Sequence, residues 1–128
     1  LTEDNDMDTL AAYRANQLLT NYSHVDSNGN MIALSVAKKL GVHQPTSEDM
    51  IEQPIGDDGW SDLTQTTITT SAVDAKTDAY QYIYEDADNT IYSNGHRDSL
   101  LNKNYSKIGI GVVYDQKNNV TYSCEDLY

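Results

Sequence analysis

The stretch NGHRDSLLNKNYSKIGIGVVY, from Asn94 to Tyr114, says more about the fold than any other part of this chain. Its polar, glycine-containing turn leads to His96, and RDSLL, from Arg97, predicts about one turn of helix. KIGIGVVY, from Lys107, predicts a strand. NVTYSCEDLY, from Asn119, predicts a second strand, and the polar DQKNN between the two predicts a hairpin turn.

In the first third of the chain, the apolar residues recur at helical spacing instead. Apolar positions from Met7 to Tyr22, including the aliphatic stem of Arg14, predict an amphipathic helix that ends before Ser23. A shorter helix is predicted from Met31 to Leu40, and Gly41 is expected to cap its C-terminus.

The middle of the chain carries weaker patterns. A short extended piece is predicted from Met50 to Ile55, and TQTTITT, from Thr64 to Thr70, fits either a strand or an extended linker. Ser71 can cap a third helix that runs to about Glu85. Helices that come first and an antiparallel hairpin that comes last predict the α+β class. The length of 128 residues, without an internal linker, predicts one domain over residues 1–128.

Charge and composition exclude several classes of partner. Twenty acidic residues against 8 basic ones give a net charge of −12. Such a chain repels phosphate backbones and anionic membrane surfaces, so nucleic acid is not an expected partner. No segment has the length and apolar character of a transmembrane helix. The single cysteine, Cys124, excludes an intrachain disulfide and a cysteine-rich zinc site, and it is expected to be a small hydrophobic residue on a strand.

Common calcium-binding and catalytic motifs are missing from the sequence. Loops that begin at Asp4, Asp26 and Asp86 lack both the glycine at the sixth position and the glutamate at the twelfth that an EF-hand needs. No serine or cysteine nucleophile is clearly placed beside a histidine, so covalent catalysis is disfavoured and no catalytic residue is assigned.

The three histidines are the remaining candidates for a site. His24 follows the first predicted helix and His96 precedes the last one, so both lie at the ends of elements, where side chains can converge on a cleft. A pair of imidazoles suits zinc or another divalent cation, and nearby carboxylates can complete the shell. Spacing alone leaves open that the two histidines are unrelated. His43 is expected on a surface loop.

Two regions of the chain resemble the signature segments of the CAP superfamily, which groups cysteine-rich secretory proteins, antigen 5 and plant pathogenesis-related proteins. The first is YSHVDSNGN, from Tyr22 to Asn30, after the helical segment LAAYRANQLL. The second runs from Asn94 to Tyr128 and combines histidine-arginine, a leucine pair, an aromatic residue and the IGIGV strand. The chain most resembles the bacterial, SCP-like extracellular branch, which implies a secreted or cell-surface protein.

The resemblance implies an α-β-α sandwich in which helices pack on a small antiparallel sheet, here without the family's first helix. It also implies a cleft with two histidines, which fall on His24 and His96 and would bind the metal. The first acidic residue of that cleft matches best in IEQPIG, as Glu52. The second falls on Glu85, with Asp86 as an alternative.

Three functions stay open for this cleft. The first is a secreted module that binds zinc, another divalent cation or a small ligand and recognises an extracellular cell-wall, lipid or host component, as the resemblance implies. The second is a metal-dependent hydrolase of peptide or cell-wall substrates, in which Glu52 or Glu85 acts as the base. The third is a structural role, in which the site joins the helices to the sheet.

Overall fold

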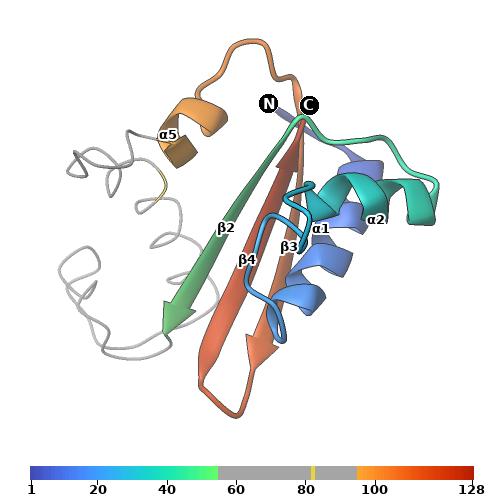
Figure 1. Ribbon diagram of the computed structural model, residues 1–128. Coiled ribbons are helices and arrows are strands. Elements are labelled where there is room, and N and C mark those ends of the chain that lie inside the picture. Colours follow the sequence, from blue (N-terminus) through green and yellow to red (C-terminus); the bar gives the residue numbers. More distant parts are fainter. Residues whose placement is uncertain (55–81, 83–94) are drawn as a thin grey trace, which may run out of the picture.

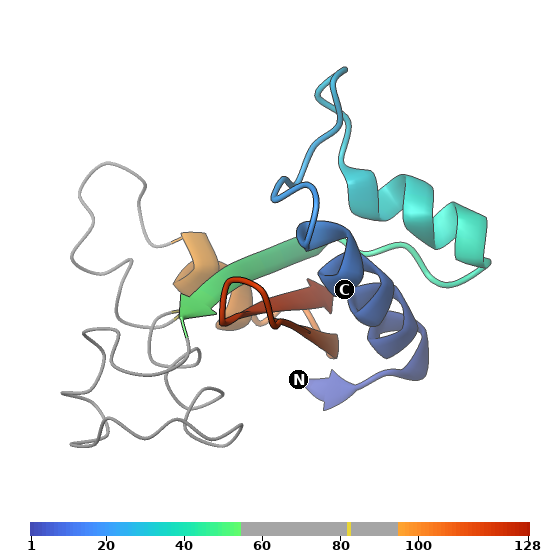
Figure 2. The ribbon, with the colours of Figure 1, turned by 90° about the horizontal axis from the view of Figure 1, so that it is seen from below.

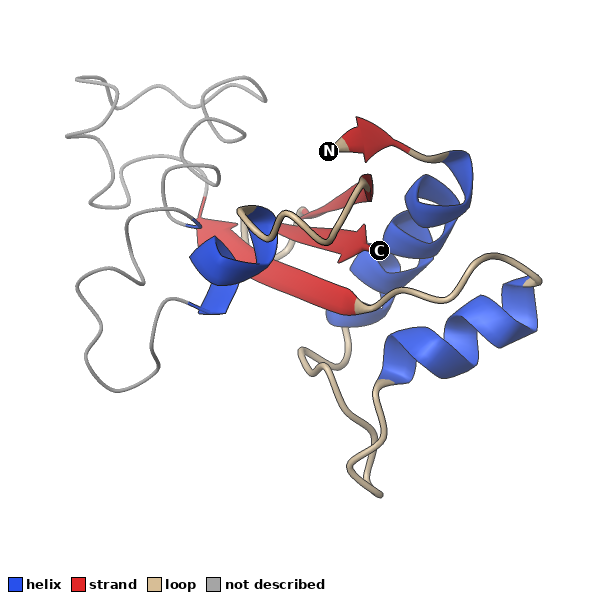
Figure 3. Ribbon diagram, turned by 90° about the horizontal axis from the view of Figure 1, so that it is seen from above, coloured by secondary structure: helices blue, strands red, loops and turns tan. Residues whose placement is uncertain are grey.

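The computed structural model describes residues 1–54, residue 82 and residues 95–128. Within these residues, a four-stranded sheet with the strand order β1-β3-β4-β2 has helices on both of its sides (Figure 1). The elements are β1 (Thr2–Glu3), α1 (Asn5–Leu18), α2 (Ile32–Leu40), β2 (Ser47–Pro54), α5 (Gly95–Leu100), β3 (Lys107–Asp115) and β4 (Val120–Leu127). Figure 2 and Figure 3 show α1 and α2 on one side of the sheet and α5 on the other. The predicted α+β class is confirmed.

The C-terminal hairpin forms as predicted. β3 and β4 pair antiparallel, from Ile108 opposite Leu127 to Asp115 opposite Val120. In the turn, the Asp115 carboxylate accepts hydrogen bonds from the backbone N–H groups of the two residues that follow Gln116. The polar turn residues therefore close the hairpin through two local hydrogen bonds to a side chain.

Two strands differ from the prediction. β2 begins at Ser47 rather than at Met50 and pairs antiparallel with β4 along its whole length. β1 lies parallel to β3, because the backbone N–H of Thr2 donates to the carbonyl of Ser106. The sheet is therefore mixed rather than wholly antiparallel.

The first helix begins and ends earlier than predicted. Asp4 caps its N-terminus, where the carboxylate accepts hydrogen bonds from the backbone N–H groups of Asp6 and Met7. Its last turn tightens, since the N–H groups of Leu19 and Thr20 donate to carbonyls three residues back. The helix therefore stops at Leu18 rather than continuing to Tyr22.

The other predicted helices have different outcomes. α2 ends at Leu40, and Gly41 takes a left-handed φ of 71° as its C-terminal cap, as predicted. α5 confirms the short helical turn around RDSLL. The predicted helix from Ser71 to Glu85 and the predicted extended segment from Thr64 to Thr70 lie outside the described residues. None of the described helices has the length and apolar character needed to cross a membrane.

Two glycines of the IGIGV strand let α1 approach the sheet closely. A Cβ atom on Gly109 would overlap the backbone of Met7, and one on Gly111 would overlap the backbone of Ala11. The helix backbone therefore rests directly on β3, and the side chains that lie beyond it, toward β4 and β2, are enclosed. Among these, Ala15, Leu18, Met50, Val120, Tyr122 and Cys124 form an apolar cluster.

Candidate functional site

Arg14 projects from α1 into the interior and is fully buried. Its guanidinium donates two hydrogen bonds to the Glu48 carboxylate, from Nε to Oε2 over 2.6 Å and from Nη2 to Oε1 over 2.9 Å. Further donors reach the side-chain oxygen of Gln17 over 2.7 Å and the carbonyl of Ser23 over 2.8 Å. Planar two-point pairing of this kind is the strong form of a charge-assisted hydrogen bond. Through these hydrogen bonds Arg14 joins α1, β2 and the segment after α1.

Glu48 is ionised in this environment. Its side chain is fully buried, and burial alone would raise the pKa. The hydrogen bonds from Arg14 and His24 outweigh that effect, so the pKa of Glu48 lies below its usual value. The carboxylate is therefore a fixed negative charge that can only accept hydrogen bonds.

His24 is held from one side by this carboxylate. Its Nδ1 lies 3.0 Å from Oε1 of Glu48, and its side chain is 43% exposed. Because the carboxylate can only accept, Nδ1 carries the proton and, in the neutral ring, Nε2 keeps a lone pair. The backbone carbonyl of His24 also accepts a hydrogen bond from the N–H of Ile32, at the start of α2. The imidazole is thus positioned while part of it stays accessible to solvent.

Of the two predicted acidic residues, the described structure includes Glu52, and the carboxylate that contacts His24 is that of Glu48 instead. Glu52 lies on β2, exposed and opposite Tyr122, on the same face as Glu48 but four residues further along. Four residues correspond to about 13 Å of strand. Glu48, which the sequence analysis did not single out, makes the contact with His24. Glu85 lies outside the described residues, and the assignment of Glu52 and Glu85 to the site stays a prediction.

His96 lies at the start of α5. Its ring meets the ring of the buried Tyr82 edge to face, with 5.1 Å between the ring centroids. The Tyr82 hydroxyl donates a hydrogen bond to the Glu125 carboxylate on β4. One turn along α5, the hydroxyl of Ser99 lies 2.8 Å from that of Ser47 at the start of β2.

These contacts place the surroundings of the two histidines on different faces of the sheet. Glu48, the partner of His24, pairs in register with Asp126, the neighbour of Glu125. Successive residues of a strand point to opposite faces, so Glu48 and Glu125 do too. Since β2 is the edge strand, a cleft shared by His24 and His96 would have to lie at that edge. The shared cleft stays a prediction.

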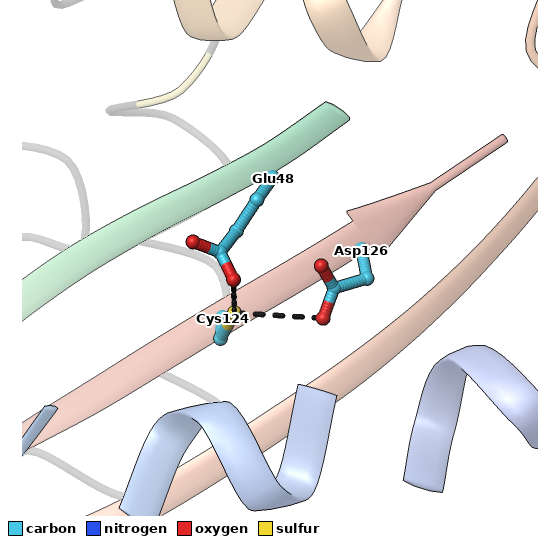
Figure 4. Close-up of side chains that lie close together, drawn as sticks. All are labelled: Glu48, Cys124 and Asp126. Carbon is cyan, nitrogen blue, oxygen red and sulfur yellow. Dashed lines mark hydrogen bonds between the residues drawn. The ribbon is translucent and has the colours of Figure 1, made fainter. Parts of the chain in front are cut away.

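A second group of polar side chains lies beside Glu48. The Cys124 thiol is 3.5 Å from Oε2 of Glu48 and 3.8 Å from Oδ2 of Asp126 (Figure 4). One ligand atom from each of the three residues lies within 4.8 Å of the others, so the group could hold a metal ion. Cys124 is buried on a strand, as predicted, but its neighbours are two acids as well as the apolar cluster.

Without a cation, the Cys124 thiol and the Asp126 carboxyl group both have raised pKa values. Burial, and then the negative charges of Asp126 and Glu48, raise the pKa of the Cys124 thiol far above its usual range. Burial, and then the charge of Glu48, raise the pKa of Asp126 to about 8. Glu48 therefore carries the charge of the group, and Arg14 balances it.

The sequence contained one signal for this arrangement. Arg14 lies on the apolar face of its helix, between Leu10 and Leu18, and only its stem was counted there. A guanidinium on a buried face needs a buried acidic partner, because an unpaired charge is too costly in the interior. That requirement calls for an acid on the sheet, but no property of the sequence alone selects Glu48.

Comparisons with known proteins identify the family of this chain. No curated protein sequence and no solved structure matched the chain. The family model described as "CAP: Cysteine-rich secretory protein family" matches residues 1–125, which is nearly the whole chain. The chain therefore belongs to the CAP, or cysteine-rich secretory protein, family.

Proposed function

We propose that this protein is a secreted CAP domain of the bacterial, SCP-like branch that binds a divalent cation such as zinc, or a small ligand, through His24 and recognises an extracellular component. The observation that carries the proposal is the chain of contacts from Arg14 through Glu48 to Nδ1 of His24. Membership of a family whose members are commonly extracellular supports the location. The single cysteine supports the bacterial branch, since the eukaryotic members of the family are disulfide-bonded and this chain cannot form an intrachain disulfide.

The contact between Glu48 and His24 is the kind that prepares a histidine for a metal. Metal-binding histidines usually donate their second ring N–H to a carboxylate, which fixes the tautomer and makes the free nitrogen more basic. Here Nδ1 faces an ionised carboxylate, so Nε2 is the ligand atom. Arg14 in turn fixes the carboxylate with two hydrogen bonds. The orientation of the ring therefore costs little free energy when a ligand binds.

A second ligand has to come from another element. We infer that His96 supplies it across the edge of β2, with Glu52 or Glu85 as the acidic residue of the cleft. A cell-wall, lipid or host molecule would then bind to the open positions of the cation. This part of the proposal rests on the family's pattern of two histidines and two acids.

A metal-dependent hydrolase is the alternative, and the described residues favour it less. Hydrolysis needs a carboxylate or imidazole that can take a proton from water near neutral pH. Glu48 is a poor base, because its pKa is lowered and Arg14 and His24 occupy its oxygens. Of the two candidate bases, Glu52 and Glu85, the structure describes Glu52, which is exposed.

Calorimetric zinc titration of four proteins tests the proposal: the native chain, His24→Ala, His96→Ala and the control His43→Ala. His43 is a matched control because it is exposed and its ring stacks on Tyr128, whereas that of His24 contacts Glu48. We expect the affinity to fall by about tenfold or more in the first two variants, as for the loss of a ligand, and to stay unchanged in the control. Equal zinc affinity in the native protein and His24→Ala would refute the proposal.

A further inference from the structure

A second cation site is suggested by the interior of the protein, on the sheet face that α1 covers. The strand register sets Glu48 directly opposite Asp126, and Met50 directly opposite Cys124. Cys124 and Asp126 are two residues apart on β4, so their side chains leave the strand on the same face. Figure 4 shows the thiol between the two carboxyl groups.

One oxygen in this group lacks a hydrogen-bond partner within residues 1–54, 82 and 95–128. Asp126 is fully buried, and among the described residues its Oδ1 meets no donor. Its other oxygen has, within the same part of the chain, the long contact of 3.8 Å with the thiol. Buried carboxyl oxygens are nearly always paired, since leaving one bare costs free energy. Figure 4 shows the carboxyl group turned toward Cys124 and Glu48, so the group that lacks a partner faces the cluster.

The distances between these ligand atoms are also close to those of a metal site. Zinc bonds to sulfur at about 2.3 Å and to carboxylate oxygen at about 2.1 Å, which puts two ligand atoms of a tetrahedral site about 3.6 Å apart. The thiol lies 3.5 Å from one carboxylate oxygen and 3.8 Å from the other. No large movement of the strands is needed to place an ion among the three atoms.

The formal charges balance with one divalent ion. When ionised, Glu48, Asp126 and Cys124 carry three negative charges, and Arg14 offsets one of them through its contact with Glu48. A single divalent cation offsets the other two. Buried charges are tolerated when they are neutralised by close partners, and this set satisfies that condition without a further residue.

We propose that Cys124, Asp126 and Glu48 form a buried binding site for one thiophilic divalent cation of the zinc type, separate from the exposed imidazole of His24. The mixed sulfur and oxygen ligands favour zinc, cobalt or cadmium over calcium and magnesium, which prefer oxygen alone. Because all three side chains are buried, the ion enters as the chain folds or during local opening of the sheet. The proposal does not rest on a role for His24 or His96.

Cobalt provides a probe that reports on sulfur directly. A thiolate bound to Co²⁺ gives a charge-transfer band in the near ultraviolet, and Cys124 is the only cysteine in the chain. The native protein is refolded with Co²⁺ and compared with Cys124→Ser, Asp126→Asn and Glu125→Gln. The last is a matched control, because it removes a neighbouring acid on the other face of the same strand.

We expect the native protein and Glu125→Gln to show a charge-transfer band that saturates at one equivalent of Co²⁺. The band should be absent in Cys124→Ser, and Asp126→Asn should bind cobalt at least tenfold more weakly. Circular dichroism checks that each variant is folded. No band in folded native protein at saturating Co²⁺ would overturn the proposal, as would equal cobalt affinity in Asp126→Asn. The His24→Ala variant separates the two sites: a retained band supports two, and a lost band contradicts their independence.

Discussion

Arg14 and Glu48 form a fully buried ion pair that joins α1 to the edge strand β2, with 2.6 Å between Nε and Oε2 and 2.9 Å between Nη2 and Oε1. The same carboxylate accepts from His24 and from the Cys124 thiol. One ion pair therefore positions the proposed ligand on the surface and also borders the proposed site in the interior.

Removing the arginine should destabilise the fold. In Arg14→Met the Glu48 carboxylate loses its main partner while it remains buried, and breaking such a pair from one side costs about 3–5 kcal/mol. Chemical denaturation measures the free energy of unfolding. Lys38→Met, an exposed change on α2, serves as the control and should cost less than about 1 kcal/mol. Similar losses in the two variants would contradict the role given to the ion pair.

Gly111→Ala tests the close approach of α1 to β3. An added Cβ would overlap the backbone of Ala11, so the helix has to move away from the sheet. We expect a loss of about 1–3 kcal/mol or more, as for overpacked interiors. Val112→Ala, at the next residue but on the exposed face, should change the free energy of unfolding by much less. A thermal melt that is equal for both variants would show that the helix does not rest on this glycine.

The sequence predicted the elements better than it predicted their contacts. The hairpin, the helix cap at Gly41 and the short α5 turn were readable because each depends on a local pattern. The glycines of the IGIGV strand were read only as part of a strand, since the helix that needs them comes about 100 residues earlier. Contacts between distant segments depend on the register of the sheet, which no local pattern encodes.

The choice between Glu48 and Glu52 shows the same limit. Both glutamates lie on β2 at positions that face the same way, so a period of two cannot separate them. The difference comes from the neighbours: Glu48 lies opposite Asp126 and within reach of Arg14, whereas Glu52 lies opposite Tyr122. Those neighbours come from β4 and α1, and only the folded chain brings them together.

Stability should depend on pH through Asp126 when a chelator keeps the protein free of metal. Burial and the charge of Glu48 raise its folded-state pKa to about 8, against an ordinary value of 3.8. The charge of Arg14 and the hydrogen bond from Cys124 lower this pKa, and the charge of Asp49 raises it. The folded state therefore holds a proton that the unfolded chain releases, and the free energy of unfolding falls as the pH rises from about 4 to about 8. Denaturation curves across this range measure the fall.

The variant Asp126→Asn isolates that contribution. An amide does not titrate, so the decrease in stability between about pH 4 and pH 8 should be smaller than in the native protein. Glu48 acts in the opposite direction, because its lowered pKa makes its contribution disappear as the pH falls. A native stability that rises steadily through this range, and is unaffected by Asp126→Asn, would contradict the raised pKa.

Loss of the carboxylate at His24 should weaken zinc binding without removing the ligand. In Glu48→Gln the side chain keeps its size but no longer holds Nδ1 with a charged acceptor, and such second-sphere changes cost about 10–100-fold in metal affinity. Because the variant also affects the interior site, it is compared within a Cys124→Ser background. Unchanged zinc affinity there would show that Glu48 does not prepare the imidazole.

The most direct test of the central claim is the nitrogen-15 spectrum of the histidine side chains during zinc titration. The arrangement of Glu48 and His24 predicts that Nδ1 of His24 keeps its proton while its Nε2 resonance moves with zinc, and that the resonances of His43 stay in place. An Nε2 resonance of His24 that does not respond to zinc, or a response at His43 of equal size, would contradict the claim that His24 is the cation ligand.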